Sequence, residues 1–163
     1  MAPAERGASP SWAHPLGQDD LGRDILSRLI RGTRVAFVVA LAAMSISLAI
    51  GVTVGAVAGY FGGVVDSLLS RVVDAILAFP LLILLITLAA VLGPSLWTVV
   101  VVIGMTSWAS YARVVRADVL SLREREFVLA ARTAGATNAR VIFRHVIPSV
   151  LGPVIVLASL SVG

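Results

Sequence analysis

The sequence predicts an all-α, polytopic membrane protein built as a transmembrane helical bundle. Of its 163 residues, 58% are hydrophobic and the mean hydropathy is +0.98, whereas soluble domains are about 45–50% apolar. The apolar residues fall in runs of about 20, the length that an α-helix needs to cross a bilayer. We therefore expect about four spans, an N-terminal amphipathic helix at the membrane interface, and a polar helical insert between the last two spans.

The composition excludes several kinds of site. The chain has no cysteine, which excludes disulfides and thiolate metal sites. All thirteen basic residues are arginine, and the lack of lysine excludes the Walker A motif, whose lysine contacts nucleotide phosphates. The net charge of +4 indicates a membrane surface rather than nucleic acid, because the arginines flank the apolar runs. We expect no catalytic residue, metal or cofactor.

Residues 1–34 are expected to form a polar N-terminal segment. Residues 1–15 contain three prolines and no apolar core, so they do not resemble a signal peptide, and the first span is expected to act as the targeting signal. Apolar residues then recur at helical spacing between arginines, at Leu21, Ile25, Leu26, Leu29 and Ile30. This pattern predicts an amphipathic interfacial helix over residues 21–34. A charged flank of the first span is a compatible alternative.

The transmembrane bundle is expected over residues 35–163, and its first span over residues 35–60. Gly51, Gly55 and Gly59 are four residues apart in this span and therefore lie on one helical face. Small residues at this spacing let a second helix approach closely. We interpret the glycines as a helix-packing surface rather than a phosphate-binding loop.

The second span is predicted over residues 72–92. Pro80 lies inside it and is expected to kink it, with neighbouring helices tolerating the freed carbonyl. Asp74 is interpreted as a boundary residue near Arg71. The alternative is a functional acid within the membrane.

The third and fourth spans are predicted over residues 96–115 and 146–163. Trp97 and Tyr111 lie near the two ends of the third span, which is typical of interfacial anchors. The alternative is that Trp108 and Tyr111 line a path for a substrate. Because eight arginines lie after the first span and in the insert, against five before the first span, the positive-inside rule predicts that the insert, residues 116–145, is cytoplasmic.

The insert is longer than a turn requires and predicts two short helices. Residues 120–134 are rich in helix-forming residues. Gly135 then interrupts the pattern as a C-cap glycine would, and Thr137 or Asn138 is a suitable N-cap for a second helix.

The first of these helices is predicted to dock into a groove of another protein. Three alanines leave a face of low relief, namely Ala130, Ala131 and Ala134. Phe127 and Val128 are the expected apolar anchors, and Arg132 is the expected charged contact at the rim. The docking residues that we expect are Phe127, Val128, Leu129, Ala130, Ala131, Arg132, Gly135 and Ala136. A solvated hairpin without a partner is the alternative.

The insert resembles the EAA loop of bacterial ABC-importer permeases. The resemblance rests on the alanine pair at 130–131, on Gly135 after three intervening residues, and on the sequence HVIP at 145–148. Other segments resemble the permeases of the dipeptide, oligopeptide and nickel group. They are HPLG at 14–17, DDLGRD at 19–24, SRL at 27–29, GYFGG at 59–63, AFP at 78–80, YAR at 111–113 and RHVIP at 144–148.

This resemblance implies a multi-pass permease subunit in the bacterial plasma membrane, which is the inner membrane of a Gram-negative cell. The subunit would form part of the translocation path for peptides or nickel. Its insert would be a coupling helix that docks on a cytoplasmic ABC ATPase subunit, and ATP hydrolysis would occur in that subunit. The other implied partners are a second permease subunit, an extracytoplasmic substrate-binding protein and the lipid bilayer.

The chain departs from the family pattern in three places. Leu129 stands where the motif has an acidic residue, and Glu126, one turn earlier, is the candidate replacement. The family also has a span before residue 14 and continues beyond residue 163, so we expect a core that lacks the first and last spans. A truncated, inactive remnant or a small membrane interaction protein remains the alternative. A membrane enzyme is a third class, but the spans contain few polar residues beyond Ser and Thr.

Overall fold

A computed structural model describes residues 7–162, with side chains described as far as Leu160. Arg6, which the arginine count included, and Gly163, the last residue of the predicted fourth span, lie outside the described residues. The chain divides into two compact units, residues 1–40 and 41–163.

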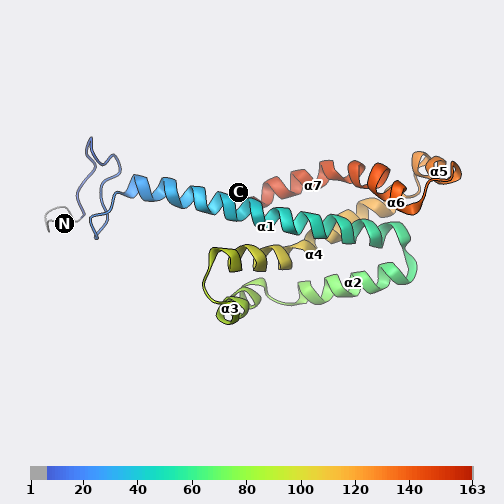
Figure 1. The fold of residues 1–163 in the computed structure, drawn as a ribbon, viewed down its shortest axis with the longest axis horizontal. Helices are drawn as coiled ribbons and strands as arrows, with labels where there is room; N and C mark the ends of the chain where they lie inside the picture. Colours follow the sequence, from blue (N-terminus) through green and yellow to red (C-terminus); the bar gives the residue numbers. More distant parts are fainter. Residues whose placement is uncertain (1–6, 163) are drawn as a thin grey trace. The chain divides into compact units, whose positions relative to one another are not determined.

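The described residues are mostly helical and form no strand, which confirms the predicted fold class. Three helical segments are long and apolar enough to cross a membrane, and a strongly bent pair of helices makes a fourth if it is counted as one span. The elements, labelled in Figure 1, are α1 (Ile25–Phe61), α2 (Gly63–Ala78), α3 (Leu81–Leu92), α4 (Leu96–Leu122), α5 (Glu126–Thr133), α6 (Asn138–Val141), a π-helical turn (Ile142–Val146) and α7 (Ile147–Val162).

In the first unit, the loop before α1 is organised around the carboxylate of Asp19. This carboxylate accepts hydrogen bonds from the Leu21 and Arg23 amides at 2.9 Å, from Arg23 Nε at 2.8 Å and from Arg28 Nη1 at 3.0 Å. The bonds, above all the one from the Arg23 amide, lower the pKa of Asp19 to about 2, because hydrogen bonds to the charged form favour it.

The predicted helix over residues 21–34 is not a separate element, which corrects the sequence-based boundary. The amide of Ser27 donates to Asp24 Oδ2 at 2.8 Å, the geometry of an N-cap, and α1 begins at Ile25. Gly22 precedes this cap with a φ of 72°. From Ile25 the helix runs to Phe61 without a break, since no proline occurs between Pro15 and Pro80 to interrupt it.

In the second unit, α1 packs against α4 along a seam of small residues. Gly51, Gly55 and Gly59 are all buried in this seam. A Cβ atom added at any of them would lie within 2.5–2.9 Å of an α4 atom, closer than two such atoms can approach. The two helices therefore touch through their backbones, which only glycine on the α1 side permits.

The seam begins earlier than the glycines indicated. Ala43 and Ser47 continue the four-residue spacing and are 2% and 1% exposed. The Ser47 hydroxyl donates to the carbonyl oxygen of Gly104 in α4 at 3.0 Å. The same spacing in the sequence was the signal that could have identified both residues.

The predicted second span is not one straight helix. It divides into α2 and α3, whose axes are bent by 82°. Phe79 is extended, with φ −85° and ψ 131°, because the residue before a proline is driven out of the helical region. Pro80 then begins α3 as its N-cap residue. A kink was expected here, and the structure makes it a sharp corner.

The second helix of the insert and the fourth span form one continuous helical segment from Asn138 onward. Residues Ile142–Val146 adopt a π-helical turn, in which the Ile147 amide donates to the Ile142 carbonyl, five residues back. Pro148 follows directly and has no amide hydrogen to donate. The wider turn accommodates its ring at a place where a regular α-helix would clash.

The main core of this unit lies where α1, α4, the insert and α7 meet. Its fully buried valines come from four helical elements and from the π-helical turn. They are Val115, Val119, Val128, Val141, Val146, Val150 and Val154. Because α5 contributes a member of this set, the insert is packed onto the bundle and does not stand free of it.

Candidate docking site

Helix α5 is shorter than the sequence predicts. The expected helix over residues 120–134 is divided, because α4 continues to Leu122 and residues 123–125 turn the chain before α5 begins at Glu126. Arg125 is extended at this break, with φ −71° and ψ 146°. Arginine and glutamate are good helix formers, so the break follows from tertiary contacts and not from local preference.

Gly135 ends α5 in the conformation expected of a C-terminal glycine. Its φ is +81°, a region that other residues adopt only with strain. The Ala136 amide donates to the Ala131 carbonyl at 3.1 Å, and the Gly135 amide donates to the Arg132 carbonyl at 3.0 Å. These two bonds define a Schellman motif. Thr137 then caps α6 by accepting a hydrogen bond from the Arg140 amide at 3.4 Å.

The predicted docking residues divide into three groups by exposure. Phe127 and Leu129 are 44% and 47% exposed. Three more are exposed, namely Ala130, Arg132 and Gly135, while Ala131 and Ala136 are half-buried. Val128 is the exception, because it is fully buried in the core of its own chain. Val128 anchors α5 to the bundle and has no surface to offer a partner, so we remove it from the docking surface.

Tyr60 was not singled out as a site residue in the sequence, yet it holds the insert in place. It lies near the end of α1 and is 4% exposed. Its hydroxyl donates to Asn138 Oδ1 at 3.0 Å and accepts from Arg132 Nε at 3.1 Å. The Arg132 guanidinium carbon also lies 4.4 Å from the centre of the tyrosine ring, within the range of a cation–π interaction. Arg132, expected to contact a partner, is thus engaged within the chain.

The ends of α1 and α2 that flank their connection lie at the same end of the unit as the insert (Figure 1) and are held by Arg116 of α4 and by Arg123, which directly follows α4. Arg116 forms a two-pronged ion pair with Asp66, in which Nη2 is 2.7 Å from Oδ2. Arg123 Nη1 donates to the Gly59 carbonyl at 3.4 Å. Paired hydrogen bonds between a guanidinium and a carboxylate are strong and directional. The connection is therefore fixed to α4.

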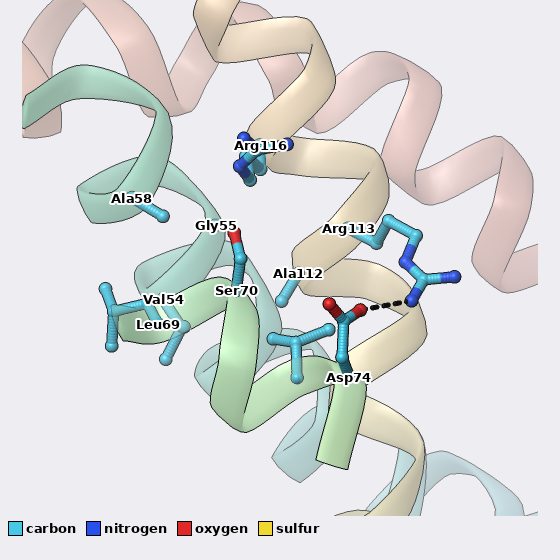
Figure 2. Close-up of a pocket in the computed structure, with 10 residues that line it drawn as sticks. Val54, Gly55, Ala58, Leu69, Ser70, Asp74, Ala112, Arg113 and Arg116 are labelled. Atoms are coloured by element: carbon cyan, nitrogen blue, oxygen red, sulfur yellow. Dashed lines mark hydrogen bonds and ion pairs between the residues drawn. The ribbon is translucent and has the colours of Figure 1, made fainter. Parts of the chain in front are cut away.

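A pocket of about 270 Å³ lies between α1, α2 and α4. Figure 2 shows Asp74 and Arg113 facing each other across its edge, where Arg113 Nη2 is 2.7 Å from Asp74 Oδ1. Both side chains are more than half exposed, and Asp74 pairs with Arg113 rather than with the nearby Arg71. Arg116 also lines the pocket but is occupied by Asp66. Both arginines that line the pocket are already paired with a carboxylate, so neither is free to bind an anion. We interpret the two ion pairs as contacts that hold α2 against α4.

Glu126 is exposed in the first turn of α5, and the side chain of Leu129 is half exposed one turn later. An acidic residue in the first turn favours the helix because it faces the positive end of the helix dipole. The acid that the motif places at position 129 is therefore replaced on the surface by an apolar side chain. Glu126 carries the carboxylate of this turn.

The fold and this site define a multi-pass helical membrane protein with a compact helical insert. The family described as "Binding-protein-dependent transport system inner membrane component" matches residues 51–163, and the chain belongs to this family. The resemblance to permeases of the peptide and nickel group is confirmed by individual relatives.

Three of these relatives are named for three different transport systems. The chain is 43% identical over 161 residues to the dipeptide transport system permease protein DppC of Alkalihalophilus pseudofirmus, covering 99% of this chain and 53% of that protein. It is 44% identical over 155 residues to the nickel transport system permease protein NikC of Escherichia coli K12, covering 95% and 56%. It is 39% identical over 153 residues to the oligopeptide transport system permease protein OppC of Bacillus subtilis, covering 94% and 50%. The chain spans about half the length of the curated relatives that it matches.

Proposed function

We propose that this chain is part of a permease subunit of an ABC importer and that it couples to a cytoplasmic ATPase through the exposed surface of α5. The observation that carries the proposal is the arrangement of α5 itself. The helix exposes apolar residues on an otherwise polar insert, and its buried Val128 fixes it to the core of the bundle. A rigid apolar ridge of this kind fits a groove on a partner.

The proposed docking surface comprises seven of the eight residues expected from the sequence. They are Phe127, Leu129, Ala130, Ala131, Arg132, Gly135 and Ala136. Phe127 and Leu129 supply most of the apolar area, and the small Ala130 lets the partner approach the helix backbone. Three exposed arginines, before α5, on α6 and in the π-helical turn, have no carboxylate partner in the described part of the chain and add positive charge to this region. They are Arg125, Arg140 and Arg144.

The remaining members of the assembly follow from the family. We propose a second permease subunit, ATPase subunits and an extracytoplasmic binding protein as partners. The proposed cargo is a peptide, with nickel as the alternative, since relatives of both names match the chain to the same extent. The insert would then face the cytoplasm, the side that the arginine distribution favours.

Docking is tested by co-purification of the chain with the ATPase subunits of its importer. Ala130→Glu places a charge on the exposed apolar surface, and we expect retention of the ATPase to fall at least about tenfold, because an unpaired charge is costly to bury in an interface. Ala139→Glu is the matched control, since Ala139 is also exposed but lies on α6. If both variants retain the ATPase as well as the parent chain does, the docking proposal is wrong.

The candidate acid is tested in the same assay. If Glu126 replaces the acid of the motif, Glu126→Gln weakens retention and Leu129→Glu, which restores the motif acid, strengthens it. Equal retention by the parent chain and by both variants would remove Glu126 from the proposal.

A further inference from the structure

The side chain of Tyr60 contacts two separate helices of the insert at once. Its hydroxyl bonds to Arg132 of α5 and to Asn138 of α6, and its ring lies beneath the Arg132 guanidinium. Phe61 packs edge-on against the ring, with centroids 5.3 Å apart. Because the ring is almost fully buried, it has little freedom to rotate away from these partners.

Helix α5 has few other attachments. Val128 is its one fully buried side chain, and in the part of the chain that the structure describes its only side-chain hydrogen bond to another helix is the one from Arg132 to Tyr60. The apolar contact of Val128 restrains the position of α5 but is not directional, whereas a hydrogen bond from a charged donor fixes orientation as well. The orientation of the docking ridge therefore depends on Tyr60.

The position of Tyr60 also suits it to transmit a displacement of α5 to α1 and α4. It is adjacent to Gly59, the last glycine of the seam in which α1 and α4 touch through their backbones. A close-packed contact of this kind transmits displacement, because it has no free space to absorb it. A force on α5 would thus reach α1 through Tyr60 and α4 through the seam.

We propose that Tyr60 is a positioning residue that orients α5 and transmits its displacement to α1. This proposal rests on the proposed function, in which α5 is the surface that the ATPase moves. The insert would then act on two helices of the bundle. It would act on α7, with which its second helix is continuous, and also directly on α1 through Tyr60.

The orienting role is tested on the chain alone in lipid nanodiscs by amide hydrogen exchange of residues 126–133. Tyr60→Phe keeps the ring and removes the hydroxyl, and we expect exchange in α5 to rise about tenfold or more, the effect of losing a hydrogen bond to a charged group. Tyr111→Phe is the matched control, because the other tyrosine of the chain makes no hydroxyl hydrogen bond in the described part. Unchanged exchange in Tyr60→Phe, or an equal rise in both variants, would overturn the orienting role.

A double-mutant cycle tests whether Tyr60 and Arg132 act as one unit. Arg132→Gln should also raise exchange in α5, and the double variant should rise by less than the product of the two single effects, because the bond between Arg132 and the Tyr60 hydroxyl is lost in both. Rises that multiply in the double variant would mean that the two residues act independently and would contradict the proposal.

The transmitting role is tested in the assembled importer. We expect transport per ATP hydrolysed to fall several-fold in Tyr60→Phe, measured with enough ATPase present to saturate docking, so that any weaker retention by a less oriented α5 does not enter the ratio. Unchanged transport per ATP would overturn the transmitting role and leave docking intact. Failure of the parent chain itself to retain the ATPase would instead contradict the proposed function, and the exchange experiment would still decide the role of Tyr60 in orienting α5.

Discussion

The seam between α1 and α4 leads to a quantitative prediction for Gly55→Ala. The added Cβ atom would lie 2.5 Å from the Ala112 carbonyl oxygen and 2.8 Å from Val115 Cβ. Neither neighbour is the end of a flexible side chain, so the two helices must separate locally to admit the methyl group.

The magnitude follows from two opposing effects. Alanine is favoured over glycine inside a helix by about 1 kcal/mol, and forcing a methyl group into a packed contact costs about 1–3 kcal/mol. Gly32→Ala, also in α1, makes the same substitution where a Cβ atom would meet nothing within 4 Å. The difference in free energy of unfolding between the two variants therefore isolates the steric cost, about 1–3 kcal/mol, with Gly55→Ala the less stable.

The assay is unfolding in mixed micelles of dodecyl maltoside and SDS, followed by far-ultraviolet circular dichroism. Both variants are compared with the parent chain under the same conditions, so that the gain in helix preference cancels. Equal stability of Gly55→Ala and Gly32→Ala would refute the inference that the helices touch through their backbones at this position.

Three further predictions concern single positions. Gly135→Ala should destabilise the insert by about 1–2 kcal/mol because of its φ of +81°, and Gly135→Asn by less, as measured by hydrogen exchange of residues 126–141; equal effects would contradict this explanation. Asp66→Asn breaks the partly buried pair with Arg116 and should cost more than Asp74→Asn, which breaks an exposed pair worth about 0–1 kcal/mol; micellar unfolding that ranks them in the opposite order would exclude this reading. The Asp19 carboxyl should titrate at about pH 2 in carbon NMR, so that its stabilisation of the N-terminal loop is complete above about pH 4 and is lost as pH falls towards 2; a midpoint near 3.8 would show that its hydrogen bonds do not persist.

The membrane class and much of the helix pattern could be predicted because they depend on local properties of the chain. Apolar runs of bilayer length predict spans whatever their neighbours are. The four-residue spacing places Gly51, Gly55 and Gly59 on one face before any partner helix is known. The corner at Pro80 has a local cause too, although its angle of 82° depends on how α3 packs against α4.

The site depended more on tertiary structure. In the sequence, Val128 is an apolar residue beside an alanine face, and nothing local says that it turns towards α4 and α7. Tyr60 and Arg132 are 72 residues apart, so their contact has no signature in spacing or composition. The end of α4 at Leu122 and the start of α5 at Glu126 likewise run against local helix preference.

The sequence by itself thus determined that this chain is a helical membrane protein of the binding-protein-dependent transport family, with a glycine face on its first helix and a helical insert broken at Gly135. The membrane class, the glycine face and the break follow from hydropathy, periodicity and the backbone freedom of glycine, whereas the family follows from the resemblance of its motifs. The tertiary structure alone decided which residues of α5 face outward and that Tyr60 ties this helix to α1. Burial and long-range hydrogen bonds depend on which helices meet, and that is a property of the folded chain as a whole.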